Sequence, residues 1–180
     1  ERLFHNVDSQ KGARLHAFGA TLPIQGNVKL GTRTLYEIKS GDAGLIRATS
    51  YDTYTGNGWK VGDRDTRRKD GGALAAPADA EKYDSRTVSI LNVTVLDSEN
   101  TILTAGMPLA TNKDATVETP SGFPGDIEQL RPRRGLEKGE TYNSIGSQSN
   151  ATVDQLRASG TDYPQWVRDR YLQLPKSLPQ

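Results

Sequence analysis

Apolar and polar residues alternate over short stretches of this chain, and such alternation is typical of half-buried β-strands. Residues 86–96 form the longest of these stretches. The apolar residues of one parity are Leu91, Val93 and Val95, and those of the other parity are Val88 and Ile90. This change of parity predicts either a β-bulge or a strand that is buried on both faces.

Other short stretches are also predicted to be strands. Residues 33–39 alternate with Tyr36 and Ile38 on one face, and residues 44–51 follow the turn signal at 40–42, so the two predict a hairpin. Two further candidate strands are residues 101–104 and 140–147. Many short strands separated by turn residues predict a mainly β fold, either an antiparallel sandwich or a barrel.

Two segments lack a strand pattern. Residues 63–84 are rich in charge, glycine and alanine, and residues 113–126 carry prolines and glycines. Both are predicted to be mobile loops. The basic run 64–69 within the first segment is predicted to be a solvated loop.

The last part of the chain changes to a helical pattern. Residues 150–160 predict a short helix with Thr152 as its N-cap, Gln155 closing a capping box and Gly160 ending it. We therefore divide the chain into a β-rich domain, residues 1–149, and a helical strap or linker, residues 150–180.

A second helix is predicted to follow within this strap. It begins near Tyr163, because Pro164 suits a first helical turn, and it ends before Pro175. The apolar face that helical spacing predicts consists of Tyr163, Val167, Tyr171 and Leu174.

Composition excludes several kinds of protein. The 180 residues carry a net charge of +1, so bulk charge does not favour binding to nucleic acid. The chain has no cysteine, which excludes cysteine nucleophiles, disulfides and thiolate metal sites. No apolar run is long enough to span a bilayer. The chain lacks coiled-coil heptads, and a monomer is expected.

The chain also lacks a recognisable catalytic constellation. Its two histidines, His5 and His16, both lie in the N-terminal segment, and no nucleophile elbow occurs. Acids such as Asp52 and Asp97 leave a carboxylate-based hydrolase as a remote alternative. We therefore predict no catalytic residue, no metal site and no cofactor.

One stretch, LIRATSYDTYTGNGWK at residues 45–60, concentrates aromatic side chains. It is predicted to be a strand that runs into a turn, with Asp52 bonding turn amides and Trp59 folding back over the sheet. Alternatively, exposed aromatic rings there would stack on sugars or peptides. The candidate binding residues are Tyr51, Asp52, Tyr54 and Trp59.

This stretch and the C-terminal passage TVDQLRASGTDYPQWVRDRYLQLPKSLP together resemble bacterial transglutaminase-like membrane proteins. The residues that match the family in the first passage are Arg47, Tyr51, Asp52, Tyr54, Gly56 and Trp59. Those that match in the second are Tyr163, Pro164, Val167, Tyr171, Leu172, Leu174 and Pro175.

The resemblance implies a context rather than an activity. In that family, transmembrane helices precede a β-rich extracytoplasmic region, and a papain-like core with a Cys-His-Asp triad follows it. The expected function is that of a non-catalytic accessory domain, tethered outside the cytoplasmic membrane, which supports the downstream core or positions its protein substrate. The expected partners are that core and a cell-envelope protein or glycan. An independent module that binds cell-wall glycans or peptides is the alternative.

Overall fold

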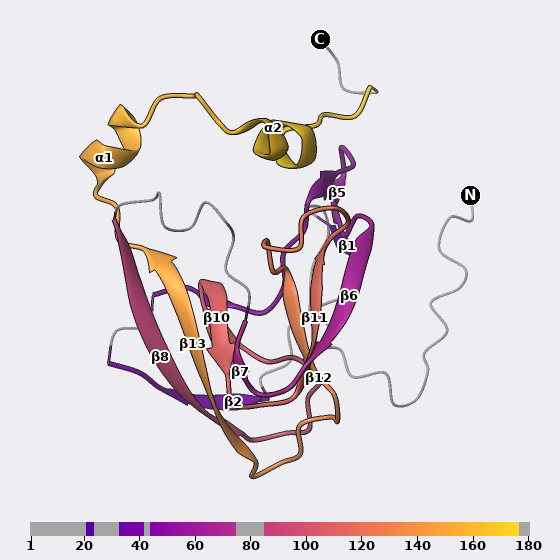
Figure 1. Cartoon of the computed structure of the whole chain (residues 1–180), viewed down its shortest axis with the longest axis vertical. Coiled ribbons are helices and arrows are strands. Elements are labelled where there is room, and N and C mark those ends of the chain that lie inside the picture. Colours follow the sequence, from indigo (N-terminus) through magenta and orange to yellow (C-terminus); the bar gives the residue numbers. More distant parts are fainter. Residues whose placement is uncertain (1–20, 24–32, 42–43, 75–84, 177–180) are drawn as a thin grey trace.

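The computed structural model describes residues 21–23, 33–41, 44–74 and 85–176, which form a mainly β structure with two short C-terminal helices (Figure 1). Every strand pair in the described residues is antiparallel. These strands form separate sheets and do not close into a barrel. The mainly β, antiparallel prediction is therefore confirmed.

The largest sheet has five strands, and its order is β2-β8-β13-β10-β7. These strands are β2 (Tyr36–Lys39), β8 (Arg86–Val95), β13 (Thr141–Ser149), β10 (Met107–Thr111) and β7 (Gly72–Ala73). A three-stranded sheet lies beside it in the order β12-β11-β6 (Figure 1). Its strands are β12 (Gln129–Pro132), β11 (Ala115–Pro120) and β6 (Arg64–Lys69).

Two smaller sheets complete the described strands. One has the order β1-β5-β4 and the other joins β3 to β9. Their bounds are β1 (Thr21–Pro23), β5 (Gly58–Lys60), β4 (Thr53–Tyr54), β3 (Ile46–Arg47) and β9 (Thr104–Ala105).

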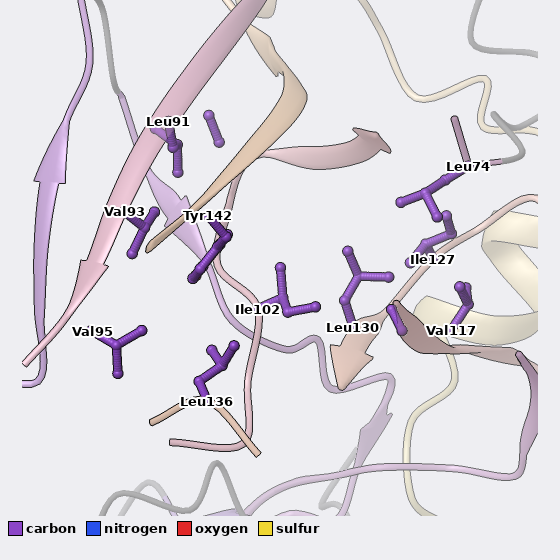
Figure 2. Close-up of a cluster of buried hydrophobic side chains, with 12 residues drawn as sticks. Leu74, Leu91, Val93, Val95, Ile102, Val117, Ile127, Leu130, Leu136 and Tyr142 are labelled. Carbon is purple, nitrogen blue, oxygen red and sulfur yellow. The ribbon is translucent and has the colours of Figure 1, made fainter. Parts of the chain in front are cut away.

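A single apolar cluster joins the two larger sheets. Side chains from β8 and β13 lie on one side of Figure 2, those from β11 and β12 lie on the other, and Ile102 lies between them. The largest contributors are Leu91, Val93, Val95, Ile102, Val117, Ile127, Leu130, Leu136 and Tyr142. Burial of this shared apolar surface holds the sheets together.

Strand β8 is regular over its whole length. It pairs with β13 without a shift in register, from Arg86 opposite Ser149 to Thr94 opposite Thr141. Val88 and Ile90 are exposed, at 62% and 52%. Both sequence-based alternatives for this strand, a bulge and double-sided burial, are therefore wrong. The second apolar parity lies on the outer face of the sheet.

The predicted hairpin of residues 33–39 and 44–51 is wrong. Strand β2 pairs with β8, whereas β3 pairs with β9, so the two segments enter different sheets. The predicted inner face of β2 is correct, because Tyr36 and Ile38 pack against the core. The Tyr36 hydroxyl also donates to the Thr101 carbonyl at 2.9 Å.

Of the two remaining strand predictions, one is correct and the other is mostly wrong. Residues 140–147 lie within β13, as predicted, apart from the first of them. Of residues 101–104, only Thr104 lies in a strand, although all four are buried.

The two predicted loops contain strands instead. Strand β6 occupies the basic run, and β11 occupies residues 115–120 of the second predicted loop, as the middle strand of its sheet. Residues 75–84 of the first predicted loop lie outside the described residues.

The first C-terminal helix forms as predicted. Helix α1 (Val153–Ala158) has Thr152 as its N-cap, and the Thr152 and Gln155 side chains complete the capping box. Gly160 follows with φ +67°, a conformation that glycine adopts without strain. No residue of α1 is buried, so its local hydrogen bonds carry its stability.

The second helix, α2 (Gln165–Tyr171), begins after Pro164, slightly later than predicted, because Pro164 is its N-cap, and it presents a different face. Tyr163 and Leu174 are exposed, whereas Trp166, Val167, Arg170 and Tyr171 are half-buried. Both helices lie at the same end of the β domain (Figure 1).

Candidate functional site

The aromatic stretch forms a tight hairpin. Strands β4 and β5 place Tyr54 directly opposite Trp59, with ring centroids 5.2 Å apart and planes tilted by 48°. The Tyr54 hydroxyl donates to the Gly56 carbonyl at 3.0 Å, and Gly56 has φ +91°. Both aromatic side chains are half-buried. The predicted turn is confirmed only in part: the chain turns at residues 55–57, but Thr53 and Tyr54, predicted within the turn, lie in β4, and the Trp59 ring packs on Tyr54.

Asp52 begins this hairpin but faces inward. It is 3% exposed, and its carboxylate accepts hydrogen bonds from the Gly62 amide at 2.7 Å and from the Thr53 hydroxyl at 2.9 Å. A Cβ at Gly62 would lie 2.8 Å from an Asp52 carboxylate oxygen, so this approach requires glycine. Asp52 also forms an ion pair with Arg170 of α2.

Tyr51 belongs to a different surface. It lines a shallow hollow with Leu22, Tyr36 and Ile38, to which Asp52, Tyr54 and Trp59 do not contribute. Burial raises the pKa of the Tyr51 hydroxyl, and Arg64 opposes this rise. The four candidate binding residues therefore do not converge on one site.

A buried charged cluster lies beneath α2. Its centre is Arg64 of β6, whose side chain is 9% exposed. The Arg64 guanidinium donates to Glu118 at 2.6 Å and to Glu128 at 2.8 Å. It also donates to the Ser50 carbonyl at 2.8 Å. The prediction that this basic run is a solvated loop is wrong, because Arg64 ties β6 to three other segments.

Glu128 is the most enclosed member of the cluster. Its side chain is fully buried and lies between Arg64 and Arg170. A guanidinium nitrogen of Arg170 lies 3.7 Å from a Glu128 carboxylate oxygen. Burial raises the pKa of the Glu128 carboxyl, Arg64 and Arg170 oppose the rise, and Asp52 adds to it. Desolvation dominates because a charged carboxylate loses its hydration here.

Two further side-chain contacts, Tyr171 with Asp126 and Trp166 with Phe123, attach α2 to the β domain. The Tyr171 hydroxyl donates to the Asp126 carboxylate, and burial followed by that contact raises the Tyr171 pKa. The Trp166 ring lies 6.0 Å from Phe123 and 6.3 Å from Tyr171, centroid to centroid. Together with Arg170, these contacts fix a helix that has no fully buried residue.

The charged cluster was missed in the sequence. The residues concerned are Arg64, Glu118, Glu128 and Arg170. A signal for two of them exists: Glu118 and Glu128 each follow a core residue directly, Val117 and Ile127. A carboxylate beside a core position marks a buried ion pair only when the position of a basic partner is known, and that position depends on the fold.

Two kinds of catalytic group can be checked at this cluster. The described residues contain no group of three or more potential metal ligands, and the chain has no cysteine for a cysteine-based triad. His5 and His16 lie outside the described residues. Within the described part of the chain, no helix has the length and apolarity needed to cross a membrane.

The charged groups of the cluster pair with one another and with Arg170, so they hold α2 on the β domain. Comparison with known proteins adds no family: no protein-family model, curated protein or solved structure matches this chain.

Proposed function

We propose that this chain is a non-catalytic accessory domain of a membrane-anchored, transglutaminase-like protein on the outer face of the cytoplasmic membrane. In this proposal the β domain holds its C-terminal arm, residues 150–176, in a set orientation. The arm in turn positions a papain-like core, or the protein substrate of that core.

The observation that carries the proposal is the ion pair between Asp52 and Arg170. Asp52 lies in the first passage that resembles the transglutaminase-like proteins, and Arg170 lies in the second. The two passages are far apart in the sequence but are in direct contact. A shared structural role, fixing the arm on the β domain, accounts for their joint presence.

The outer surface of the arm supports the same role. Four apolar side chains of the arm are at least half exposed, and they are Val153, Leu156, Leu172 and Leu174. They are two pairs, Val153 with Leu156 and Leu172 with Leu174, and in the proposed function each pair offers apolar surface to another domain. The arm is therefore anchored on one side and available for packing on the other.

Two measurements test the proposal. The gene should encode hydrophobic helices before Glu1 and a core with a Cys-His-Asp triad after Gln180, and a stop codon directly after Gln180 would overturn it. The second measurement uses the absence of native cysteine. Spin labels on Asn92→Cys and Asp169→Cys should give a narrow distance distribution by electron resonance, which broadens in Arg170→Ala.

An alternative function is favoured by a different observation. The stacked rings of Tyr54 and Trp59 are only half-buried, so part of the hairpin surface is available to a glycan or peptide of the cell wall. Calorimetry with peptidoglycan fragments should then show heat of binding that Tyr54→Ala removes. The exposed Tyr163→Ala serves as the matched control, and equal binding by both variants would exclude this alternative.

A further inference from the structure

Two arginines face a hollow at the base of the C-terminal arm. Arg47 of β3 and Arg86 of β8 line this hollow of about 620 Å³, together with Gly44, Met107 and Asn150. None of the described residues that line it is acidic. Among these described lining residues, the hollow therefore has two positive charges and no negative one.

Neutral acceptors hold both guanidinium groups. Arg86 donates to the Ser147 hydroxyl at 2.7 Å and to the Ser147 carbonyl at 2.6 Å. Arg47 Nε donates to the Ser50 hydroxyl at 2.9 Å. Neither arginine forms an ion pair with a described carboxylate. Their orientation is fixed, while no carboxylate of the described residues compensates their charge by direct contact.

The surroundings of Arg47 make its charge costly. Burial lowers the Arg47 pKa, and the charge of Arg86 lowers it further. The Arg47 pKa is raised, without direct contact, by Asp126, Tyr171 and Glu128. Two of these groups already have other partners, because Asp126 accepts a hydrogen bond from Tyr171 and Glu128 accepts one from Arg64. An anion in the hollow would relieve this cost, because it would contact both guanidiniums directly.

A second, apolar hollow adjoins the first. It measures about 760 Å³ and shares Leu45, Arg47 and Gly106 with the arginine-lined hollow. Leu45 is 88% exposed at this junction, and Leu22 is 47% exposed on the apolar side. Large apolar groups so exposed around a concave surface favour an apolar ligand.

We propose that the two hollows form one binding groove for a phosphate monoester that carries an apolar group. The phosphate bonds Arg47 and Arg86, and the apolar group lies against Leu45 and its neighbours. A phosphate monoester carries a charge of about −1.5 to −2 near neutral pH, which matches two guanidiniums. Arginine also suits phosphate because its planar fork donates two parallel hydrogen bonds. This proposal does not depend on the accessory function.

The test is an NMR titration of the whole chain with three soluble probes. Octyl phosphate, kept below its micelle concentration, should bind saturably, and inorganic phosphate should bind at least about tenfold more weakly because it lacks the apolar group. Octyl glucoside, which has the same tail and no charge, should not bind in this range. Equal binding of octyl phosphate and octyl glucoside would overturn the proposal.

Variants separate the two halves of the groove. Arg86→Gln and Arg47→Gln should each weaken octyl phosphate binding about tenfold or more, because each removes a charged hydrogen bond. The exposed Arg134→Gln is the matched control and should bind as the wild type does. Leu45→Ser changes only a surface side chain, so it keeps the fold. It should weaken octyl phosphate binding and leave inorganic phosphate binding unaffected.

Two further outcomes would overturn the proposal. One is that Arg86→Gln and Arg47→Gln, with NMR spectra of folded protein, bind octyl phosphate as tightly as Arg134→Gln does. The other is binding only to vesicles that contain phosphatidic acid and not to the soluble ester, since that result requires a membrane surface rather than a groove.

Discussion

Arg64 and Glu128 form a hydrogen-bonded ion pair at 2.8 Å, in which the side chains are 9% and 0% exposed. The pair links β6 to the segment that precedes β12 and forms the floor beneath α2. Because neither charge reaches bulk solvent, the pair is more sensitive to the loss of one partner than an ion pair on the surface would be.

The stability of this chain should depend on pH through Glu128. Burial raises the pKa of Glu128 in the folded state above its ordinary value of 4.5, so the folded state binds the proton more readily than the unfolded state does. The contribution of Glu128 to stability is thus fully present below pH 4.5 and is lost as the pH rises through the folded-state pKa. Urea unfolding across this window should show that difference between wild type and Glu128→Gln. Parallel stability curves for the two proteins would contradict it.

Arg170→Ala should detach α2 from the β domain. The change leaves the buried Asp52 carboxylate without its cation, and we expect a loss of about 1–3 kcal/mol in unfolding free energy, limited by hydration of the vacated site. In a Trp59→Phe background, Trp166 is the only tryptophan, and its emission should shift to the red. Arg168→Ala on the same helix is the control, because Arg168 pairs with a fully exposed Asp162 and should change little. Unchanged Trp166 emission in the Arg170 variant would show that other contacts hold the helix.

Tyr142→Phe should destabilise the core through one backbone group. The Tyr142 hydroxyl accepts a hydrogen bond from the Leu103 amide at 2.8 Å, and both residues are buried. Its loss leaves that amide unpaired and should cost about 1–3 kcal/mol. Thermal or urea unfolding measures the cost, with the exposed Tyr163→Phe as a control. A variant as stable as the control would indicate that Leu103 finds another partner.

Gly146→Ala should be among the most damaging small substitutions in the chain. A Cβ at Gly146 would lie 1.9 Å from the Ala105 carbonyl oxygen, so β13 and β9 would have to separate. We expect a loss of about 1–3 kcal/mol in unfolding free energy, the usual range for overpacked sites. Gly41→Ala is the control, since a Cβ there meets nothing within 4 Å. Similar unfolding midpoints for the two variants would argue against this close approach.

Local signals in the sequence predicted the elements whose stability is local. The capping box of Thr152 and Gln155 and the stop at Gly160 lie within one helix, so its beginning and end are visible in the sequence. The same applies to the turn around Gly56, and to the inner face of β2 at Tyr36 and Ile38.

Elements that depend on distant partners were not visible. Strand β6 is rich in arginine and looks solvated, yet it pairs along its length with β11, and its Arg64 meets carboxylates on β11 and near β12. The buried role of Asp52 likewise depends on Arg170 in the C-terminal arm. A charged side chain is buried here only where the fold places a group of opposite charge beside it. The position of that group depends on the order of the strands in the sheets and on where α2 packs.

The anchoring of α2 by side chains alone has a mechanical consequence. Tension applied to the arm beyond Tyr171 would load the contacts of Arg170, Tyr171 and Trp166 before it reached β13, a central strand of the largest sheet. Those contacts would break first and release the slack of residues 150–164, so the hydrogen bonds of β13 would be spared. These contacts thus set a threshold of force. Below it the arm stays attached and force passes to the β domain, and above it α2 detaches while the β domain stays folded.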